Sequence, residues 1–378
     1  MKLHCPYRVA LQQRVLPRYR LAFIEALAEA CEGGLYVFAG QPLEVEGIES
    51  AEGLQVAHLT QAQNLCFRDP SSSFFLCWQR GFVRWLEKVQ PQVLIVEANP
   101  RNLSTRLGVR WMHRHGKGVI GWGLGAPPLT GFFAGLRAWE RQSMLRSLDA
   151  VIAYSRGGAE QYRLLGMPAE RVFVASNAVV RRPAQPPLER PLTDSTPLTV
   201  LVVGRLQKRK RVDHLLYACA SLPPERQPRL LIAGEGPERE ALETLAREVY
   251  PRAEFLGARF GADLEPYFAV ADLFVLPGTG GLAVQQAMAH ALPVIVARGD
   301  GTQDDLVRPE NGWQIAPDDL EALKTALNLA LSDPGRLRRM GQEAFRVVAQ
   351  EINVNVMVEV FLKALSVACT QTDIGPRW

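Results

Sequence analysis

The sequence is poor in the residues that build disulfide-linked frameworks. Its 378 residues include only six cysteines, and no two of them form a C-x-x-C pair. The cysteines are scattered, and most stand in apolar stretches. Isolated cysteines in apolar surroundings are typical of reduced core residues. The pattern therefore argues against a secreted disulfide scaffold, and we expect a cytoplasmic protein.

Long apolar runs are missing as well. No stretch reaches the roughly 18 apolar residues that a membrane span requires. The first twenty residues have no sustained apolar run and no cleavage site, so we expect no signal peptide. Basic patches with interleaved aromatics are absent, which argues against a nucleic-acid partner. With 47% hydrophobic and 22% charged residues, the composition is that of a globular protein of about two or three domains.

The net charge of +4 is small but unevenly distributed. Residues 1–180 contain 20 Lys and Arg against 14 Asp and Glu, whereas the remainder contains 23 against 25. A basic first half fits an acidic acceptor or an anionic membrane surface, although ordinary variation accounts for such a difference too.

Hydrophobic periodicity predicts two α/β lobes. Short apolar segments alternate with helical patterns of 10–15 residues, which is typical of βαβ units around a parallel sheet. A proline-rich stretch without periodicity, residues 181–198, interrupts the alternation and predicts a linker. The predicted strands are residues 7–12, 35–39, 93–97, 119–122, 199–203, 229–233, 255–257, 273–276 and 294–296. The predicted helices are residues 21–31, 74–89, 102–115, 136–147, 212–220, 237–249, 264–270, 282–290 and 354–369.

Two strand-to-helix turns can bind anions. In the first, VVGRLQKRKRVD, Arg205 and Lys210 lie between a strand and a helix, a placement that suits a diphosphate. A charged run of this kind is otherwise most often a solvated loop. In the second, the glycine-rich turn that begins at Gly278 opens a helix whose first N–H groups are unpaired. The alternative for the second is a tight turn and nothing more.

These two turns resemble those of retaining glycosyltransferases with the two-lobed GT-B fold, specifically family 4. Gly-Arg-x-x-x-x-Lys, here Gly204 to Lys210, opens the second lobe of that family. Further matches are residues 232–237 (IAGEGP), residues 255–257 (FLG), the Ala-Met-Ala of residues 287–289 and the Pro-Val of residues 293–294.

The resemblance implies a role for each matching position. Arg205 and Lys210 hold the diphosphate of a nucleotide sugar and stabilise it as it leaves. Main-chain atoms near Ala258 and Arg259 hold the base. The fold implied is GT-B, with residues 1–180 as the acceptor lobe, 199–352 as the nucleotide-sugar lobe, and a helix in 353–378 that returns to the first lobe.

The donor-sugar loop departs from the family pattern. The family has two glutamates, at the positions of Gly278 and Gln286, and a phenylalanine at the position of Gly280. We expect the donor sugar to be held by the main chain of Gly278, Thr279, Gly280, Gly281 and Leu282. Gln286 can still bind a ribose hydroxyl. Arg211, where the family usually has glycine, predicts a different loop shape or a third cation.

The first lobe offers weaker candidates. Residues 97–101 (EANPR) follow a strand, and Asn99 and Arg101 are placed to contact substrate, with Arg101 able to bind an anionic acceptor. The alternative is a helix cap with solvated neighbours. Residues 121–126 hold Trp122, and Leu124 occupies the position of a histidine found in many relatives. The aromatic segments 74–89 and 129–139 suit either core packing or peripheral membrane contact.

The sequence thus predicts a metal-independent retaining glycosyltransferase without a cofactor. The substrates expected are a nucleotide-diphosphate sugar and a glycan, lipid-linked or small-molecule acceptor. We expect the pair Asp304–Asp305 not to bind metal, because the fold needs none. A catalytically silent nucleotide-binding subunit and a nucleotide-sugar epimerase are the alternatives.

Overall fold

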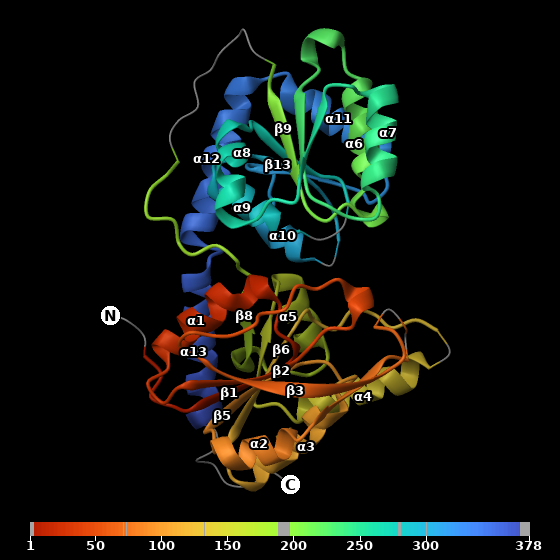
Figure 1. Cartoon of the computed structure of the whole chain (residues 1–378). Coiled ribbons are helices and arrows are strands. Elements are labelled where there is room, and N and C mark those ends of the chain that lie inside the picture. Colours follow the sequence, from red (N-terminus) through yellow and green to blue (C-terminus); the bar gives the residue numbers. More distant parts are fainter. Residues whose placement is uncertain are drawn as a thin grey trace. The chain divides into compact units, whose positions relative to one another are not determined.

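The computed structural model describes residues 4–70, 72, 74–131, 133–187, 197–278, 281–299 and 301–370. The expected site residues Thr279 and Gly280 lie outside these ranges. The chain forms two compact units. The first contains Met1–Val179 together with Val354–Trp378, and the second contains Val180–Asn353. Each unit is a sheet with helices on its faces (Figure 1).

The first unit is built around an eight-stranded sheet with the order β4-β3-β2-β1-β5-β6-β7-β8. All its neighbouring strands are parallel except β3 and β4. Its strands are β1 Val9–Val15, β2 Leu35–Gly40, β3 His58–Phe67, β4 Leu76–Arg80, β5 Val93–Glu97, β6 Gly118–Gly123, β7 Ala150–Ala153 and β8 Val172–Val174. Its helices are α1 Leu21–Ala30, α2 Phe82–Val89, α3 Leu103–Arg114, α4 Ala134–Arg146, α5 Arg156–Leu164 and α13 Val354–Thr370.

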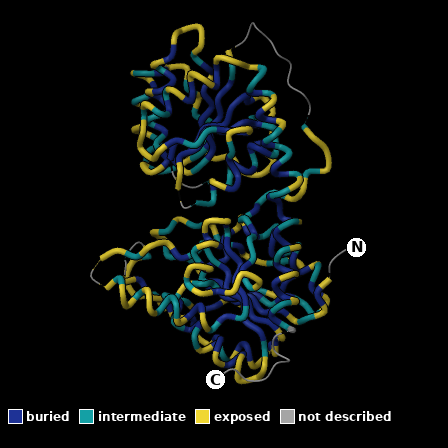
Figure 2. Tube along the Cα trace, turned by 180° about the vertical axis from the view of Figure 1, so that it is seen from behind, coloured by how far each residue is buried: buried dark blue, intermediate teal, exposed yellow. Residues whose placement is uncertain are grey.

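Alternating side chains of this sheet enter two separate cores. In β5, Val93 and Ile95 pack in the cluster that contains α1 and α13. Leu94 and Val96 pack in the cluster that contains α2, α3 and α4. Successive strand residues point to opposite faces, so both faces of the sheet are covered by helices. In Figure 2 the strands are accordingly buried between more exposed helices.

The second unit has a six-stranded parallel sheet with the order β11-β10-β9-β12-β13-β14. Its strands are β9 Thr199–Val203, β10 Arg229–Ala233, β11 Ala253–Gly257, β12 Leu273–Leu276, β13 Val294–Ala297 and β14 Gly312–Ile315. Its helices are α6 Val212–Ala220, α7 Arg239–Val249, α8 Glu265–Val270, α9 Ala283–Ala289, α10 Thr302–Leu306, α11 Leu320–Leu331 and α12 Pro334–Gln350. Five predicted elements have the predicted bounds, namely β5 of the first unit and β9, β10, β12 and α6 of the second.

The predicted helix over residues 74–89 is wrong in its first half. Leu76–Arg80 is instead a strand, β4, paired antiparallel with β3, a strand that the sequence did not predict. Its residues alternate between exposed and buried, as in a strand with one covered face. Gly81 has a φ of 80° and separates the strand from α2. In α2, Phe82 and Trp85 pack against Phe38 in the core.

The C-terminal helix belongs to the first unit. Phe361 of α13 packs edge-on against Phe23 of α1 and Trp122 of β6. The region Pro334–Cys369 is long and apolar enough to cross a membrane by composition, yet 56% of its most apolar window is buried within the protein. Packing into the two units accounts for this apolar character.

Candidate functional site

The strand order of the second unit identifies where a ligand binds. Strands β9, β10 and β11 run to one side and β12, β13 and β14 to the other, so the order reverses between the neighbours β9 and β12. Open α/β sheets bind ligands at the carboxyl ends of the strands at this reversal. The loops that leave β9 and β12 there are residues 204–211 and 277–282. They hold most of the donor-site residues predicted from the sequence.

Lys210 is the buried cation of this region, with 7% of its surface exposed. Burial, and to a smaller extent repulsion from Arg209, lowers the pKa of Lys210 to about 8. A Cβ on Gly204 would lie 4.0 Å from Cε of Lys210, so the lysine side chain extends along that glycine. Arg205, the other predicted phosphate ligand, is exposed. The two cations thus differ: one is fixed in the protein and the other is accessible.

Gly278 packs against the main chain of the phosphate loop. A Cβ at this position would overlap the carbonyl oxygen of Arg209 and the Cα of Lys210. No side chain fits there unless the loop moves, because main-chain atoms cannot rotate away as a side chain can. Gly278 occupies the position of the first family glutamate. With the neighbouring loop in this position, a glutamate side chain does not fit at residue 278.

Arg211 has a left-handed backbone conformation, which glycine adopts more easily than other residues. Its φ of 53° lies in the left-handed region, at the residue that caps α6. Its guanidinium pairs with Asp318 at 2.8 Å and with Asp213 at 3.2 Å. The charge of Arg211 is thus paired with carboxylates of its own unit.

The other predicted donor residues lie at neighbouring strand ends. Gly281 has a φ of 154°, and a Cβ there would overlap the side chain of Leu276. Leu282 precedes α9, and Gln286 is half-buried within it. Ala258 and Arg259 are exposed and follow β11 at the edge of the sheet. Asp304 and Asp305 lie in α10, and among the described residues no group of three or more His, Cys, Asp or Glu side chains could hold a metal ion.

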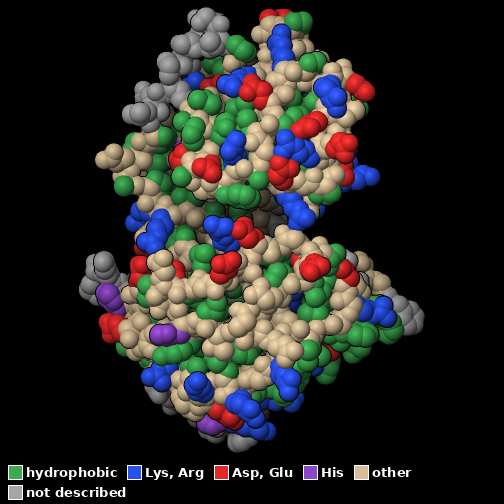
Figure 3. Space-filling model, in the orientation of Figure 1, with side chains coloured by type: hydrophobic (Ala, Val, Ile, Leu, Met, Phe, Trp, Pro, Cys, Tyr) green, Lys and Arg blue, Asp and Glu red, His purple; other side chains and the backbone are tan. Residues whose placement is uncertain are grey.

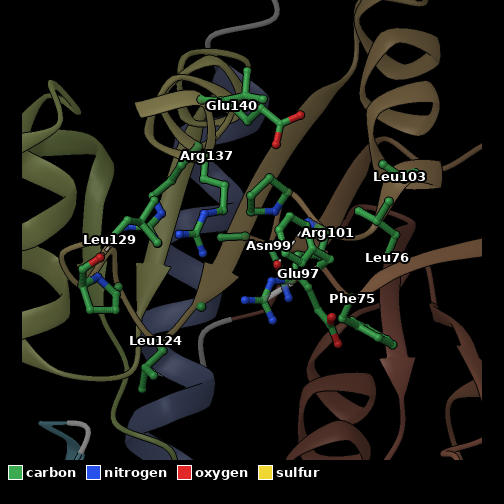
Figure 4. Close-up of a pocket in the computed structure, with 18 of the residues that line it drawn as sticks. Phe75, Leu76, Glu97, Asn99, Arg101, Leu103, Leu124, Leu129, Arg137 and Glu140 are labelled. Atoms are coloured by element: carbon green, nitrogen blue, oxygen red, sulfur yellow. Dashed lines mark hydrogen bonds between the residues drawn. The ribbon is translucent and has the colours of Figure 1, made fainter. Parts of the chain in front are cut away.

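The first unit contains a cavity of about 820 Å³ at the carboxyl ends of β5, β6 and β7 (Figure 4). All four predicted acceptor-side residues, Asn99, Arg101, Trp122 and Leu124, line it. Figure 4 shows Arg101, in the loop after β5, and Arg137, on α4, on either side of the cavity. The topology therefore brings together residues that are far apart in the sequence, from Phe67 to Tyr154.

The loop after β5 holds Arg101 in place through its main chain. The side chain of Asn99 accepts a hydrogen bond from the Arg101 N–H at 3.2 Å. The Arg101 carbonyl accepts from the N–H of Cys77 on β4 at 2.9 Å. Asn99 is thus a turn residue that positions Arg101, and Asn102 holds the N-cap position of α3. Asn102 also donates to Glu97 at 2.6 Å.

Trp122 and Leu124 contribute differently from what the sequence indicated. Trp122 is 1% exposed and packs in an aromatic cluster with Phe23, Phe361 and Tyr154. The guanidinium of Arg20 lies 4.2 Å from its ring. Its main role is therefore core packing. Leu124, at the position of the family histidine, lines the cavity with an apolar side chain and provides no acid or base.

Sequence reasoning missed three further arginines of this cavity, namely Arg68, Arg137 and Arg141. Arg137 and Arg141 are one helical turn apart on α4, and Arg68 directly follows β3, a strand that the sequence did not predict. Burial lowers the pKa of Arg141, and repulsion from Arg137 and Arg101 lowers it further, while Tyr162 acts in the opposite direction. The sequence signal that could have identified Arg137 and Arg141 is the mixture of apolar residues and arginines in residues 129–141.

Comparison with known proteins identifies a family domain in the second unit and solved structures with the same fold. The model of the family "Glycosyl transferases group 1" matches residues 188–347, which is most of the second unit. Among solved structures, HepE from Anabaena in complex with UDP has a TM-score of 0.68 at 16% identity, covering 95% of this chain and 99% of that chain. Two parallel-sheet α/β units of this kind form the GT-B fold, the class of protein to which the chain belongs.

Two curated relatives are glycosyltransferases by name. The lipopolysaccharide core biosynthesis glycosyltransferase LpsE of Rhizobium meliloti is 25% identical over 307 residues, which span 75% of this chain and 87% of LpsE. A GDP-mannose-dependent alpha-mannosyltransferase of Mycobacterium tuberculosis is 36% identical over 194 residues, 48% of this chain and 47% of that protein. The second unit thus carries the group 1 domain, and the named relatives support a glycosyltransferase with the GT-B fold.

Proposed function

We propose that the chain is a retaining glycosyltransferase of the family 4 type, which transfers a sugar from a nucleotide-diphosphate sugar to an acceptor. The observation that carries this proposal is the cluster at the strand reversal of the second unit. Lys210 lies there against both Gly204 and Gly278, although these residues belong to two separate strand-to-helix turns. The proposal includes a cytoplasmic location and a reaction without a metal ion.

Arg205 and Lys210 supply the positive charge that a diphosphate requires. In the transfer the bond between the sugar and the diphosphate breaks, and negative charge accumulates on the leaving phosphate. Lys210 is held in a partly desolvated position, where its charge stabilises this phosphate more strongly than it would in water. Arg205, which is exposed, can form two parallel hydrogen bonds to phosphate oxygens. Retention of configuration requires the acceptor hydroxyl to attack from the face that the phosphate leaves.

The donor sugar is held by main-chain groups in this proposal. Gly278 has no carboxylate, and its surroundings leave no room for one. The N–H groups of Gly281 and Leu282, at the start of α9, take over the hydroxyl contacts. Gln286 binds the ribose as a neutral donor and acceptor, and the main chain at Ala258 and Arg259 binds the base. HepE binds UDP and the mycobacterial relative is named for GDP-mannose, so both bases are candidates.

One assay tests the proposal against its two alternatives. The purified chain is incubated with UDP-, GDP- and dTDP-sugars, with and without candidate acceptors, and the released nucleotide and the sugar products are measured. A transferase releases nucleotide with at least one donor, and the anomeric configuration of the product is that of the donor. A silent subunit binds nucleotide without release, and an epimerase changes the sugar without an acceptor. Either of these two outcomes contradicts the proposal.

A further inference from the structure

The cavity of the first unit contains more positive charge than the protein itself neutralises. Four arginines line it, Arg68, Arg101, Arg137 and Arg141, against two carboxylates, Glu97 and Glu140. Within the described part of the chain, none of the four arginines forms an ion pair with a carboxylate. Glu97 accepts hydrogen bonds from the N–H of Arg14 at 2.9 Å and from Asn102. Glu140 pairs with Arg106 at 3.2 Å.

Two of these guanidinium groups are held in position by main-chain carbonyls. Arg141 donates to the carbonyl of Pro127 at 2.6 Å, and Arg137 donates to the carbonyl of Thr130. The turn at Asn99 fixes the backbone of Arg101. Each guanidinium has five N–H donors, so most of them remain for a ligand. Burial is the main cause of the lowered pKa of Arg141, and repulsion from Arg137 and Arg101 adds to it. An anion that binds among these arginines relieves the repulsion.

The mouth of the same cavity is apolar. Phe74 and Phe133 meet there with ring centroids 5.8 Å apart, and Arg68 lies over the Phe74 ring at 5.8 Å. Phe67 and Leu136, also lining residues, are 61% and 58% exposed. Trp139, one turn beyond Leu136 on α4, is 64% exposed. Hydrophobic and basic side chains therefore lie together along the α4 edge of the first unit (Figure 3).

This combination identifies an occupant with two chemical parts. A free anionic sugar would use the arginines but would leave the exposed aromatic rim in water, where such a patch is unfavourable. A neutral hydrocarbon would use the rim but would leave the arginines without a counter-charge. We propose that the cavity binds an amphiphilic acceptor, a phosphate group attached to a hydrocarbon chain, with the phosphate between Arg101, Arg137 and Arg141 and the chain along Phe67, Phe74 and Leu136.

The acceptor role rests on the proposed function, whereas the binding itself does not. Binding is measured by titration calorimetry on the full chain, with dodecyl phosphate below its micelle concentration as the probe. Inorganic phosphate and dodecyl maltoside test the two parts separately. We expect dodecyl phosphate to bind at least tenfold more tightly than either. Equal affinity of inorganic phosphate, or of the neutral maltoside, would overturn the proposal.

Two pairs of variants locate the site. Arg137→Ala combined with Arg141→Ala should weaken dodecyl phosphate binding at least tenfold, whereas Arg146→Ala, on the same helix but outside this cavity, should not. Leu136→Ser should weaken it several-fold, and Leu164→Ser, an exposed leucine on α5, should not. Unchanged UDP or GDP affinity in each variant shows that the protein is folded. Equal losses in a variant and its control would overturn the assignment, and absence of sugar transfer would leave it standing.

Discussion

The candidate sites of the two units are formed by different parts of the chain. In the second unit, the candidate donor site is a set of main-chain contacts between loops, and glycines occur where a side chain would collide with a neighbouring backbone. Gly234 packs against Gly204, and Gly236 against Leu206, in the same way as Gly278 packs against Arg209. In the first unit, the cavity is formed by long side chains, four of them arginines. A site formed by main-chain atoms depends on the geometry of its loops. A site formed by side chains can acquire a different ligand when one of these side chains is substituted.

The largest expected effect comes from restoring the family glutamate at position 278, which tests whether the site of the second unit depends on main-chain geometry. Gly278→Glu supplies the missing carboxylate, yet we expect it to damage the site, because the new Cβ overlaps the main chain of Arg209 and Lys210. The free energy of unfolding should fall by about 3 kcal/mol, and nucleotide binding should weaken at least about tenfold. Thermal unfolding and nucleotide titration measure both.

The control for this substitution is Gly299→Glu. Gly299 is exposed in the same unit, and a Cβ there would meet nothing within 4 Å. We expect this variant to keep the stability and the nucleotide affinity of the parent chain. A Gly278→Glu protein with normal stability and faster transfer would show that the loop accommodates the glutamate, and the proposed main-chain sugar site would be wrong.

The same contrast explains which features could be predicted from the sequence. Main-chain geometry can be predicted from a short segment of sequence, because a glycine or a strand-to-helix turn with fixed spacing is visible in a few consecutive residues. The strands β9 and β12 were therefore predicted with the correct bounds. The conformation of Arg211 was not, since a left-handed φ in a non-glycine residue depends on its partners Asp213 and Asp318.

The cavity of the first unit is harder to predict from the sequence, because the fold brings together lining residues from distant segments of the chain. Arg68 follows β3, Arg101 follows β5 and Arg137 lies on α4, and only the fold brings them together. The aromatic run near residue 78 was interpreted as a helix because its apolar residues also fit helical spacing. Antiparallel pairing with β3 decided otherwise, and this pairing is a long-range contact that a single window of sequence does not contain.

Removing the phosphate-binding cations should have the next largest effect. Arg205→Ala and Lys210→Ala should each weaken nucleoside diphosphate binding by about 1.5–3 kcal/mol, roughly tenfold to more than a hundredfold, by loss of a charge-assisted bond. Titration calorimetry measures the affinity, and Arg229→Ala, whose guanidinium pairs with Glu254 on the neighbouring strand, is the control. Unchanged affinity in both variants would refute the phosphate assignment.

The pH dependence of nucleotide binding should distinguish Lys210 from an arginine. The lysine must be protonated to attract phosphate, and its pKa is lowered to about 8 by burial. Its charge is therefore largely present at pH 7 and is lost as the pH rises through 8, so affinity should fall about tenfold between pH 7 and pH 9. Lys210→Arg should flatten this profile, because arginine stays charged. A flat profile in the parent chain would contradict a role for Lys210.

A change in the first unit should act on the acceptor alone. Arg101→Ala should raise the KM for an anionic acceptor about fivefold, while kcat and the affinity for the nucleotide stay the same, because the lost bond is partly exposed to water. Arg110→Ala, an exposed arginine on α3 outside the cavity, serves as the control. An equal loss of nucleotide affinity in Arg101→Ala would mean that the two sites are not separable in this way.

Chelation should have the smallest effect of all. We expect transfer to continue in EDTA at the same rate, because Arg205 and Lys210 supply the positive charge for the leaving diphosphate. The described residues also offer no cluster of three or more His, Cys, Asp or Glu side chains that could hold a metal ion. The rate is measured before and after dialysis against EDTA, and then with added Mg²⁺ or Mn²⁺. A loss of activity that either ion restores would direct attention to Asp304 and Asp305 of α10, whose carboxylates are the nearest acidic pair in the sequence to the donor loop. In that case Asp304→Asn should lower the apparent metal affinity. The donor site of the second unit would then consist of a metal ion in addition to the two cations and the main-chain groups.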